Sequence, residues 1–157
     1  MARGRGIAAA FLVPVLVAAV AGSCHKKTND KGSAMNDRQE STATLAQLAQ
    51  EAGVSFPPGA RLVGSARENG MDDLLRFKVE LRPADLPAFL STSPVPADAF
   101  DAGEGGFLGP DQGFWDPHQA KRLRTGQKIL PGQRALNIGI DDGRGDVVAI
   151  YVVNHGT

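Results

Sequence analysis

The strongest constraint on the fold is an alternation of side chains in the run from Asp73 to Arg82. Charged residues at 76, 78 and 80 alternate with the apolar residues Leu75, Phe77, Val79 and Leu81. A period of two residues is typical of a β-strand with one buried face. The run 60–67 is predicted to be the partner strand, because turn residues that include Asn69-Gly70 separate the two runs. The sequence therefore predicts a β-hairpin.

The other expected elements follow along the chain. A short helix capped by Ser41 or Thr42 and ended by Gly53 is predicted, with apolar positions at Leu45, Leu48, Ala49 and Ala52. A second helix is expected to begin at Pro83. A long loop over 95–113 and a helical turn from Asp116 to about Arg124 come next. Strands are predicted at 134–141 and 146–154, and the second should be central because it is apolar on both faces. We expect a small α+β domain of two layers, an antiparallel sheet of about four strands in ββαββ order with helices on one face.

Composition limits the classes of function. The chain has 157 residues with 17 Lys+Arg against 17 Asp+Glu, so no basic surface for nucleic acid is expected. The 19 glycines and 10 prolines are too many for a helical bundle, and the length excludes a large multidomain enzyme. Because there is only one cysteine, no internal disulfide can form. One compact, loop-rich domain is expected.

The N-terminus has the pattern of an export signal. Arg3 and Arg5 precede an uncharged, mostly apolar run from Ile7 to Ser23, interrupted by Pro14. A run of about 17 residues is short for a membrane-spanning helix, which needs about 20. Without the two arginines of this leader, the chain has a net charge of about −2.

The sequence Val20-Ala21-Gly22-Ser23-Cys24 resembles the lipobox of bacterial lipoproteins, with Ala21 where leucine is usual. The resemblance covers about the first 24 residues. It implies cleavage before Cys24 and lipidation of that cysteine with diacylglycerol and an acyl chain such as palmitate, which would anchor the protein durably. It also implies a cell-membrane or outer-membrane location, with the domain facing the periplasm or the exterior. The family's sorting habit makes His25, in place of Asp, favour the outer membrane.

These features divide the chain into three predicted parts. Residues 1–23 are the signal peptide, and 24–40 are the lipidated cysteine and a flexible tether. The stretch 25–40 contains Met35 as its one large apolar side chain, too little to bury a core. Residues 41–157 form the single α+β domain.

Candidate catalytic chemistry is limited to His118 beside Asp116. The carboxylate could orient the imidazole for general-base work, but a capping role for Asp116 with a solvated His118 is the favoured interpretation. The chain has no nucleophile motif, phosphate-binding loop or zinc-ligand cluster. We therefore assign no catalytic residue, metal or cofactor.

The loop over 95–115 is the best candidate for binding. It carries four aromatic residues, Phe100, Phe107, Phe114 and Trp115, which either pack into the core or form a binding surface. Arg122 and Arg124 belong to a basic group that could bind an anionic ligand or partner, although a solvated helix face is the favoured interpretation.

Three functions remain open from the sequence. The first is a non-enzymatic lipoprotein that binds an envelope protein or surface component while its anchor holds it on membrane lipid. The second is a small periplasmic enzyme that uses His118 and Asp116. The third is an inhibitor or immunity-type protein with a dedicated protein partner. The absence of catalytic motifs favours the first.

Overall fold

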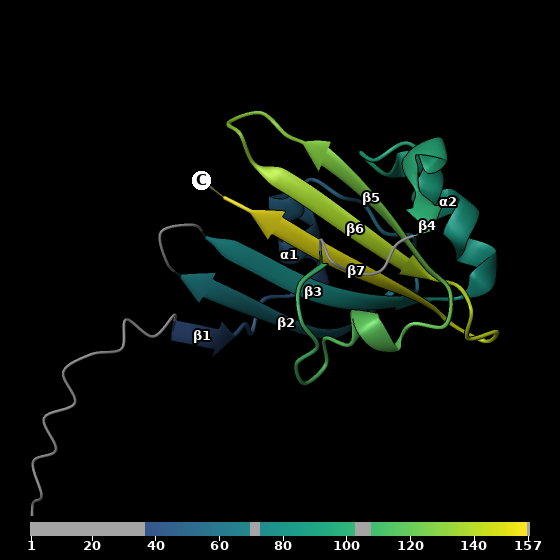
Figure 1. Ribbon diagram of the computed structural model, residues 1–157, viewed down its shortest axis with the longest axis horizontal. Helices are drawn as coiled ribbons and strands as arrows, with labels where there is room; N and C mark the ends of the chain where they lie inside the picture. The colour runs from purple at the N-terminus through teal and green to yellow at the C-terminus, as the bar shows by residue number, and fades with distance from the viewer. Residues whose placement is uncertain (1–36, 70–72, 103–107, 157) are drawn as a thin grey trace, which may run out of the picture. The chain divides into compact units, whose positions relative to one another are not determined.

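The computed structural model describes residues 37–69, 73–102 and 108–156 of the chain. This part of the chain forms a seven-stranded sheet in which each neighbouring pair is antiparallel (Figure 1). The spatial order is β1-β2-β3-β7-β6-β5-β4. The strands are β1 Asp37–Glu40, β2 Arg61–Asn69, β3 Leu74–Leu81, β4 Asp101–Ala102, β5 Leu123–Ile129, β6 Ala135–Asp141 and β7 Val148–His155. The predicted α+β class is confirmed, and so is the β2–β3 hairpin.

Two short helices accompany the sheet. Helix α1, Leu45–Ala52, begins at Thr44, whose side chain accepts from the backbone N–H of Gln47 while the Gln47 side chain accepts from the N–H of Thr44. This capping box lies two or three residues after the predicted caps, Ser41 and Thr42, so that prediction is wrong. Gly53 ends α1 as expected, with a left-handed φ of 67°. The 3₁₀ turn η1, Pro83–Asp85, leads directly into α2, Leu86–Thr92.

The main core lies between the helices and one face of the sheet. Alternate residues of the central strands point to this face, where they meet Leu48 and Ala52 of α1 and Phe89 of α2. The strand residues in this core are Leu75, Phe77, Val79, Leu81, Leu136, Ile138, Ile140, Val148, Ile150 and Val152. The helices therefore cover one face, as the amphipathic patterns predicted.

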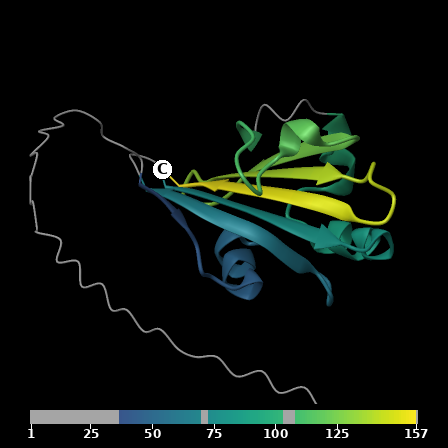
Figure 2. The ribbon, with the colours of Figure 1, turned by 90° about the horizontal axis from the view of Figure 1, so that it is seen from below.

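The opposite face is covered by the irregular segment 108–119, seen as the green segment above the strands in Figure 2. Trp115 and Leu108 pack there against Tyr151 and its neighbours on β7. Glycine at 139 permits this close approach, because a Cβ there would lie 2.5 Å from a methyl carbon of Leu108. Strand β7 is therefore buried on both faces, which confirms the prediction of a central strand.

The predicted number and order of strands are wrong. The helical turn expected from Asp116 to about Arg124 is only the 3₁₀ turn η4, Pro117–Gln119, and the chain then enters β5. Thr125 and Gly126 are weak helix formers, and pairing with β6 satisfies the backbone of β5 instead. Strand β4 lies inside the predicted loop, and β1 occupies the last four residues of the predicted tether.

The predicted signal peptide and Cys24 lie outside the described residues, as does most of the tether. Within the residues that the structure describes, no helix is long and apolar enough to cross a membrane.

Candidate functional site

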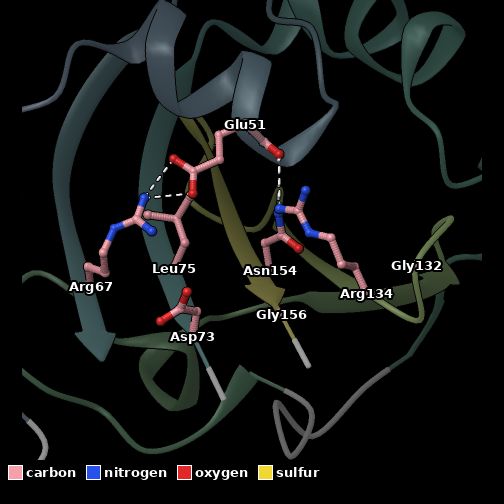
Figure 3. Close-up of a pocket in the computed structure, with 8 residues that line it drawn as sticks. All are labelled: Glu51, Arg67, Asp73, Leu75, Gly132, Arg134, Asn154 and Gly156. Carbon is pink, nitrogen blue, oxygen red and sulfur yellow. Dashed lines mark hydrogen bonds and ion pairs between the residues drawn. The ribbon is translucent and has the colours of Figure 1, made fainter. Parts of the chain in front are cut away.

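A pocket of about 320 Å³ opens at one end of the sheet, under the C-terminal end of α1 (Figure 3). It lies where β2 and β7 end and β3 begins, beside the connection between β5 and β6. Its volume is in the range of small-ligand sites in proteins. The lining residues are Glu51, Arg67, Asp73, Leu75, Gly132, Arg134, Asn154 and Gly156.

Glu51 joins the surrounding elements at the top of this pocket. Both oxygens of its carboxylate accept from Nη2 of Arg67 at 2.6 Å, which ties α1 to β2. Its backbone carbonyl, near the end of the helix, accepts from Arg134 at 3.1 Å and from Asn154 at 3.4 Å. The last carbonyls of a helix lack partners inside the helix, so these contacts also cap α1. These contacts therefore join four segments at the pocket: α1, β2, the connection between β5 and β6, and β7.

Asn154 is the most unusual residue of the pocket. It lies on the core face of β7, follows Ile150 and Val152 at the strand period, and is only 1% exposed. Its side-chain nitrogen donates to the Glu51 carbonyl, while its Oδ1 is buried without a hydrogen-bond partner among the described residues. Figure 3 shows the amide nitrogen turned toward Glu51 and the oxygen turned away from it. An unsatisfied buried acceptor costs about 1–3 kcal/mol, so a native protein that keeps one requires an explanation.

Two opposite charges of the pocket, Arg134 and Asp73, have no ionic partner among the described residues. Within the described part of the chain, Arg134 forms no ion pair with a carboxylate and donates instead to the backbone carbonyl of Glu51. The carboxylate of Asp73 forms no ion pair with any described residue, although its backbone carbonyl accepts from the N–H of Gly156 at 2.7 Å. Glu51 and Arg67, in contrast, neutralise each other. Among the wall residues that the structure describes, Arg134 and Asp73 are therefore left without an ionic partner.

Sequence reasoning missed this site because its residues come from five separate segments. One signal was available: Asn154 is a polar residue at a core-facing position of the most apolar strand. A buried polar residue in such a strand is informative in a way that an exposed one is not.

The candidate pairing of His118 with Asp116 does not form. Both Nδ1 and the backbone N–H of His118 lie within 3.0 Å of Oδ1 of Asp111 instead. The pKa of Asp111 is lowered: desolvation opposes ionisation, but these bonds and a bond from Gln119 outweigh it. His118 is 46% exposed and, in the described part of the chain, contacts no serine, threonine or cysteine hydroxyl or thiol. The pair therefore lacks a nucleophile to activate.

Asp116 belongs to a polar network between the covering segment and the sheet. Its carboxylate accepts from Nζ of Lys78 at 2.5 Å and from the hydroxyl of Tyr151 at 2.9 Å, with Arg144 at 3.6 Å. Burial disfavours ionisation of Asp116, but these partners outweigh it and lower its pKa. The pKa of Tyr151 is raised, first by burial and then by its bond to the Asp116 carboxylate. Asp116 makes no side-chain cap, so the predicted capping role is also wrong.

The aromatic residues of the 95–115 loop pack inward wherever the structure describes them. Phe100 is buried in the main core beside Gly126. Trp115 is buried against Tyr151 with ring centroids 5.3 Å apart, and its indole N–H donates to the carbonyl of Leu108. Phe114 is half-buried over Gly64. These three take the core-packing alternative, and Phe107 lies outside the described residues.

Arg122 and Arg124 both pair with Asp142, at 2.5 and 3.1 Å, across the β5–β6 strands rather than from a helix face. The neighbouring Arg144 pairs with the buried Asp141 at 2.8 Å. Burial disfavours ionisation of Asp141. The bond from the Arg144 side chain and the backbone N–H bonds from Arg122 and Gly143 outweigh this effect and lower the pKa of Asp141. No cluster of three or more metal-ligating side chains is found among the described residues. Arg122 and Arg124, the candidate anion-binding residues, are thus paired with a carboxylate of the same domain.

No protein-family model, curated protein or solved structure matches this chain. The pocket geometry is therefore the basis for the functional argument.

Proposed function

We propose that this protein is a lipid-anchored component of the bacterial cell envelope whose domain binds a small charged solute in the pocket beside Asn154. The anchor is the diacylglycerol and acyl chain on Cys24, supported by the lipobox-like sequence before that cysteine. The domain faces the periplasm or the exterior from the cell membrane or the outer membrane. Its role is binding, not catalysis.

The observation that carries the binding role is the buried, unpartnered Oδ1 of Asn154 in the wall of a ligand-sized pocket. Among the described residues this oxygen has no hydrogen-bond donor, which costs stability, and a ligand that donates to it removes that cost. Binding sites commonly accept such local costs at the expense of stability. Catalysis has less support, since His118 and Asp111 form an exposed pair without a nucleophile in the described residues.

The test is a thermal-shift panel on the full-length chain in detergent. The panel holds amino acids, sugars, nucleotides, dicarboxylates and polyamines at millimolar concentration. A ligand at 100 times its Kd stabilises the folded state by about 2.7 kcal/mol, which raises Tm by several degrees. We expect at least one class to raise Tm.

The Asn154→Leu variant should lose this rise, while Asn137→Leu, altered on the opposite face of the sheet, should keep it. A panel in which no class raises the Tm of the wild-type chain contradicts the proposed function.

A further inference from the structure

We infer that the solute is a zwitterion of the amino-acid class, with a free carboxylate and a free ammonium group. This inference rests on the proposed function and names the ligand chemistry of the same pocket. It follows from three features of the wall: the donors of Arg134, the acceptors of Asp73 and Asn154, and the pocket volume.

Arg134 supplies the site for the carboxylate. A guanidinium group has five N–H donors in a planar fork that matches a carboxylate. Among the described residues, Arg134 bonds to the backbone carbonyl of Glu51 and forms no ion pair, so most of its donors remain for a ligand. Arg67 cannot take the same role as readily, because the Glu51 carboxylate already neutralises it.

Asp73 and Asn154 supply the site for the ammonium group. Oδ1 of Asn154 accepts no hydrogen bond within the described structure, and the Asp73 carboxylate pairs with no described cation. An ammonium group has three donors and no acceptor, so it suits both oxygens. Oδ1 is almost completely covered, so binding requires a neighbouring side chain to move. Arg134 donates to the same Glu51 carbonyl as Asn154, and we expect it to turn from Glu51 toward the ligand carboxylate (Figure 3).

The mixed charge of the wall discriminates against simpler ions. A dicarboxylate would satisfy Arg134 but place negative charge beside Asp73 and leave Oδ1 of Asn154 without a donor. A polyamine would satisfy the two acceptors but place positive charge against Arg134. Leaving a polar group of a binding site unpaired is a strong source of specificity.

The pocket size favours a single amino acid. A volume of about 320 Å³ corresponds to about ten water-sized atoms at roughly 30 Å³ each. This accommodates one amino acid of moderate length and excludes a long peptide held wholly inside. Leu75, 3% exposed, adds an apolar contact for the aliphatic part of the ligand side chain.

Calorimetric titration of the full-length chain in detergent tests the inference, with L-glutamine as the probe. N-acetyl-L-glutamine lacks the ammonium charge, and L-glutamine methyl ester lacks the carboxylate. We expect L-glutamine to bind and each blocked form to bind at least about tenfold more weakly. Succinate and putrescine should show no binding.

Charge-matched variants locate the site. Arg134→Gln and Asp73→Asn should each weaken L-glutamine binding at least about tenfold. Arg61→Gln, at the far end of β2 from Arg67, and Asp98→Asn, on the exposed turn η2 (Ala97–Ala99), should leave it within about twofold.

The outcomes separate the inference from the proposed function. If the blocked forms bind as tightly as L-glutamine, the zwitterion inference is wrong and the binding function stands. The same holds if no amino acid of the panel binds while another class raises Tm of the wild type but not of Asn154→Leu. If no solute of any class binds, both fall.

Discussion

At the scale of single residues, Asn154 and Asn137 are a matched pair. Both are buried, on the adjacent central strands β7 and β6, but they face opposite sides of the sheet. Oδ1 of Asn137 accepts from Gln127 at 2.8 Å, whereas Oδ1 of Asn154 has no hydrogen-bond partner in the described structure. The fold satisfies the Asn137 oxygen but not the Asn154 oxygen, so we assign a ligand to Asn154.

This contrast predicts opposite effects of the same substitution. Asn154→Leu removes an unsatisfied acceptor, and the Glu51 carbonyl keeps its bond from Arg134, so the free energy of unfolding should stay the same or rise by about 1 kcal/mol. Asn137→Leu removes a satisfied group and should lower it by about 1 kcal/mol. Urea unfolding measures both. A larger loss in Asn154→Leu than in Asn137→Leu would show that the Asn154 side chain is a structural group.

Asp116 predicts how stability depends on pH. Its pKa in the folded protein is lowered, so the folded state binds fewer protons than the unfolded state around the unfolded value of about 3.9. The stabilisation is therefore fully present above that value and is lost as pH falls through the folded pKa. Asp111 and Asp141 shift in the same direction. The free energy of unfolding should fall steeply below about pH 4.

The Asp116→Asn variant checks this assignment. It leaves Lys78, whose side chain is 6% exposed, without its anion, and should cost about 2–3 kcal/mol at neutral pH. Its stability should then fall less steeply below pH 4 than that of the wild type, as measured by urea unfolding at a series of pH values. Parallel acid slopes in the two proteins would assign the dependence to other carboxylates.

At the scale of elements, the short helix α1 holds Glu51 over the pocket. Its eight residues are too few to be stable alone, so the capping box at Thr44 matters. Thr44→Ala should lower the free energy of unfolding by about 1 kcal/mol and weaken ligand binding, because α1 carries the Glu51 carbonyl that orients Asn154 and Arg134.

Thr42→Ala is the control, because Thr42 is exposed and has no side-chain bond in the described structure. It should change stability by less than about 0.5 kcal/mol. Urea unfolding measures both variants. If the two substitutions lower the free energy of unfolding equally, the Thr44 cap does not stabilise α1 as proposed.

The elements also show what the sequence could predict. The hairpin β2–β3 and the central strand β7 were predictable, because periodicity follows directly from burial on one face or on both. Strand β5 was not, since its burial does not alternate: Leu123–Thr125 are half-buried, Gly126 is buried and Gln127–Ile129 are exposed. Asp116-Pro117 indicated a helix start, but the Asp116 carboxylate binds Lys78 and Tyr151 instead, a tertiary contact that local pattern cannot reveal.

The pocket could not be predicted from the sequence either, because it also depends on tertiary contacts. Glu51, Arg67, Asp73, Arg134 and Asn154 meet only because β7 lies between β3 and β6 in the sheet. The sequence candidates, Arg122 and Arg124, were chosen by charge alone and proved to be paired with Asp142. Strand order decides which distant residues share a site, and the sequence does not state that order.

At the scale of the whole molecule, we propose that a lipid anchor on Cys24 carries the binding domain. Cys24→Ala removes the thiol needed for lipidation, so the variant should move from the detergent phase to the aqueous phase in detergent phase partition. His25→Ala keeps the cysteine and should remain in the detergent phase. A Cys24→Ala protein that still partitions into detergent would refute the anchor without affecting the pocket.

The most direct test of the central claim is the NMR signal of the Asn154 side-chain amide during titration of the full-length protein with L-glutamine. The signal is assigned by its loss in Asn154→Leu. We expect the Asn154 amide to shift progressively to saturation while the Asn137 amide, on the opposite face of β6 and β7, stays in place. An Asn154 signal that does not move at millimolar L-glutamine, or that moves no more than that of Asn137, would contradict amino-acid binding in this pocket.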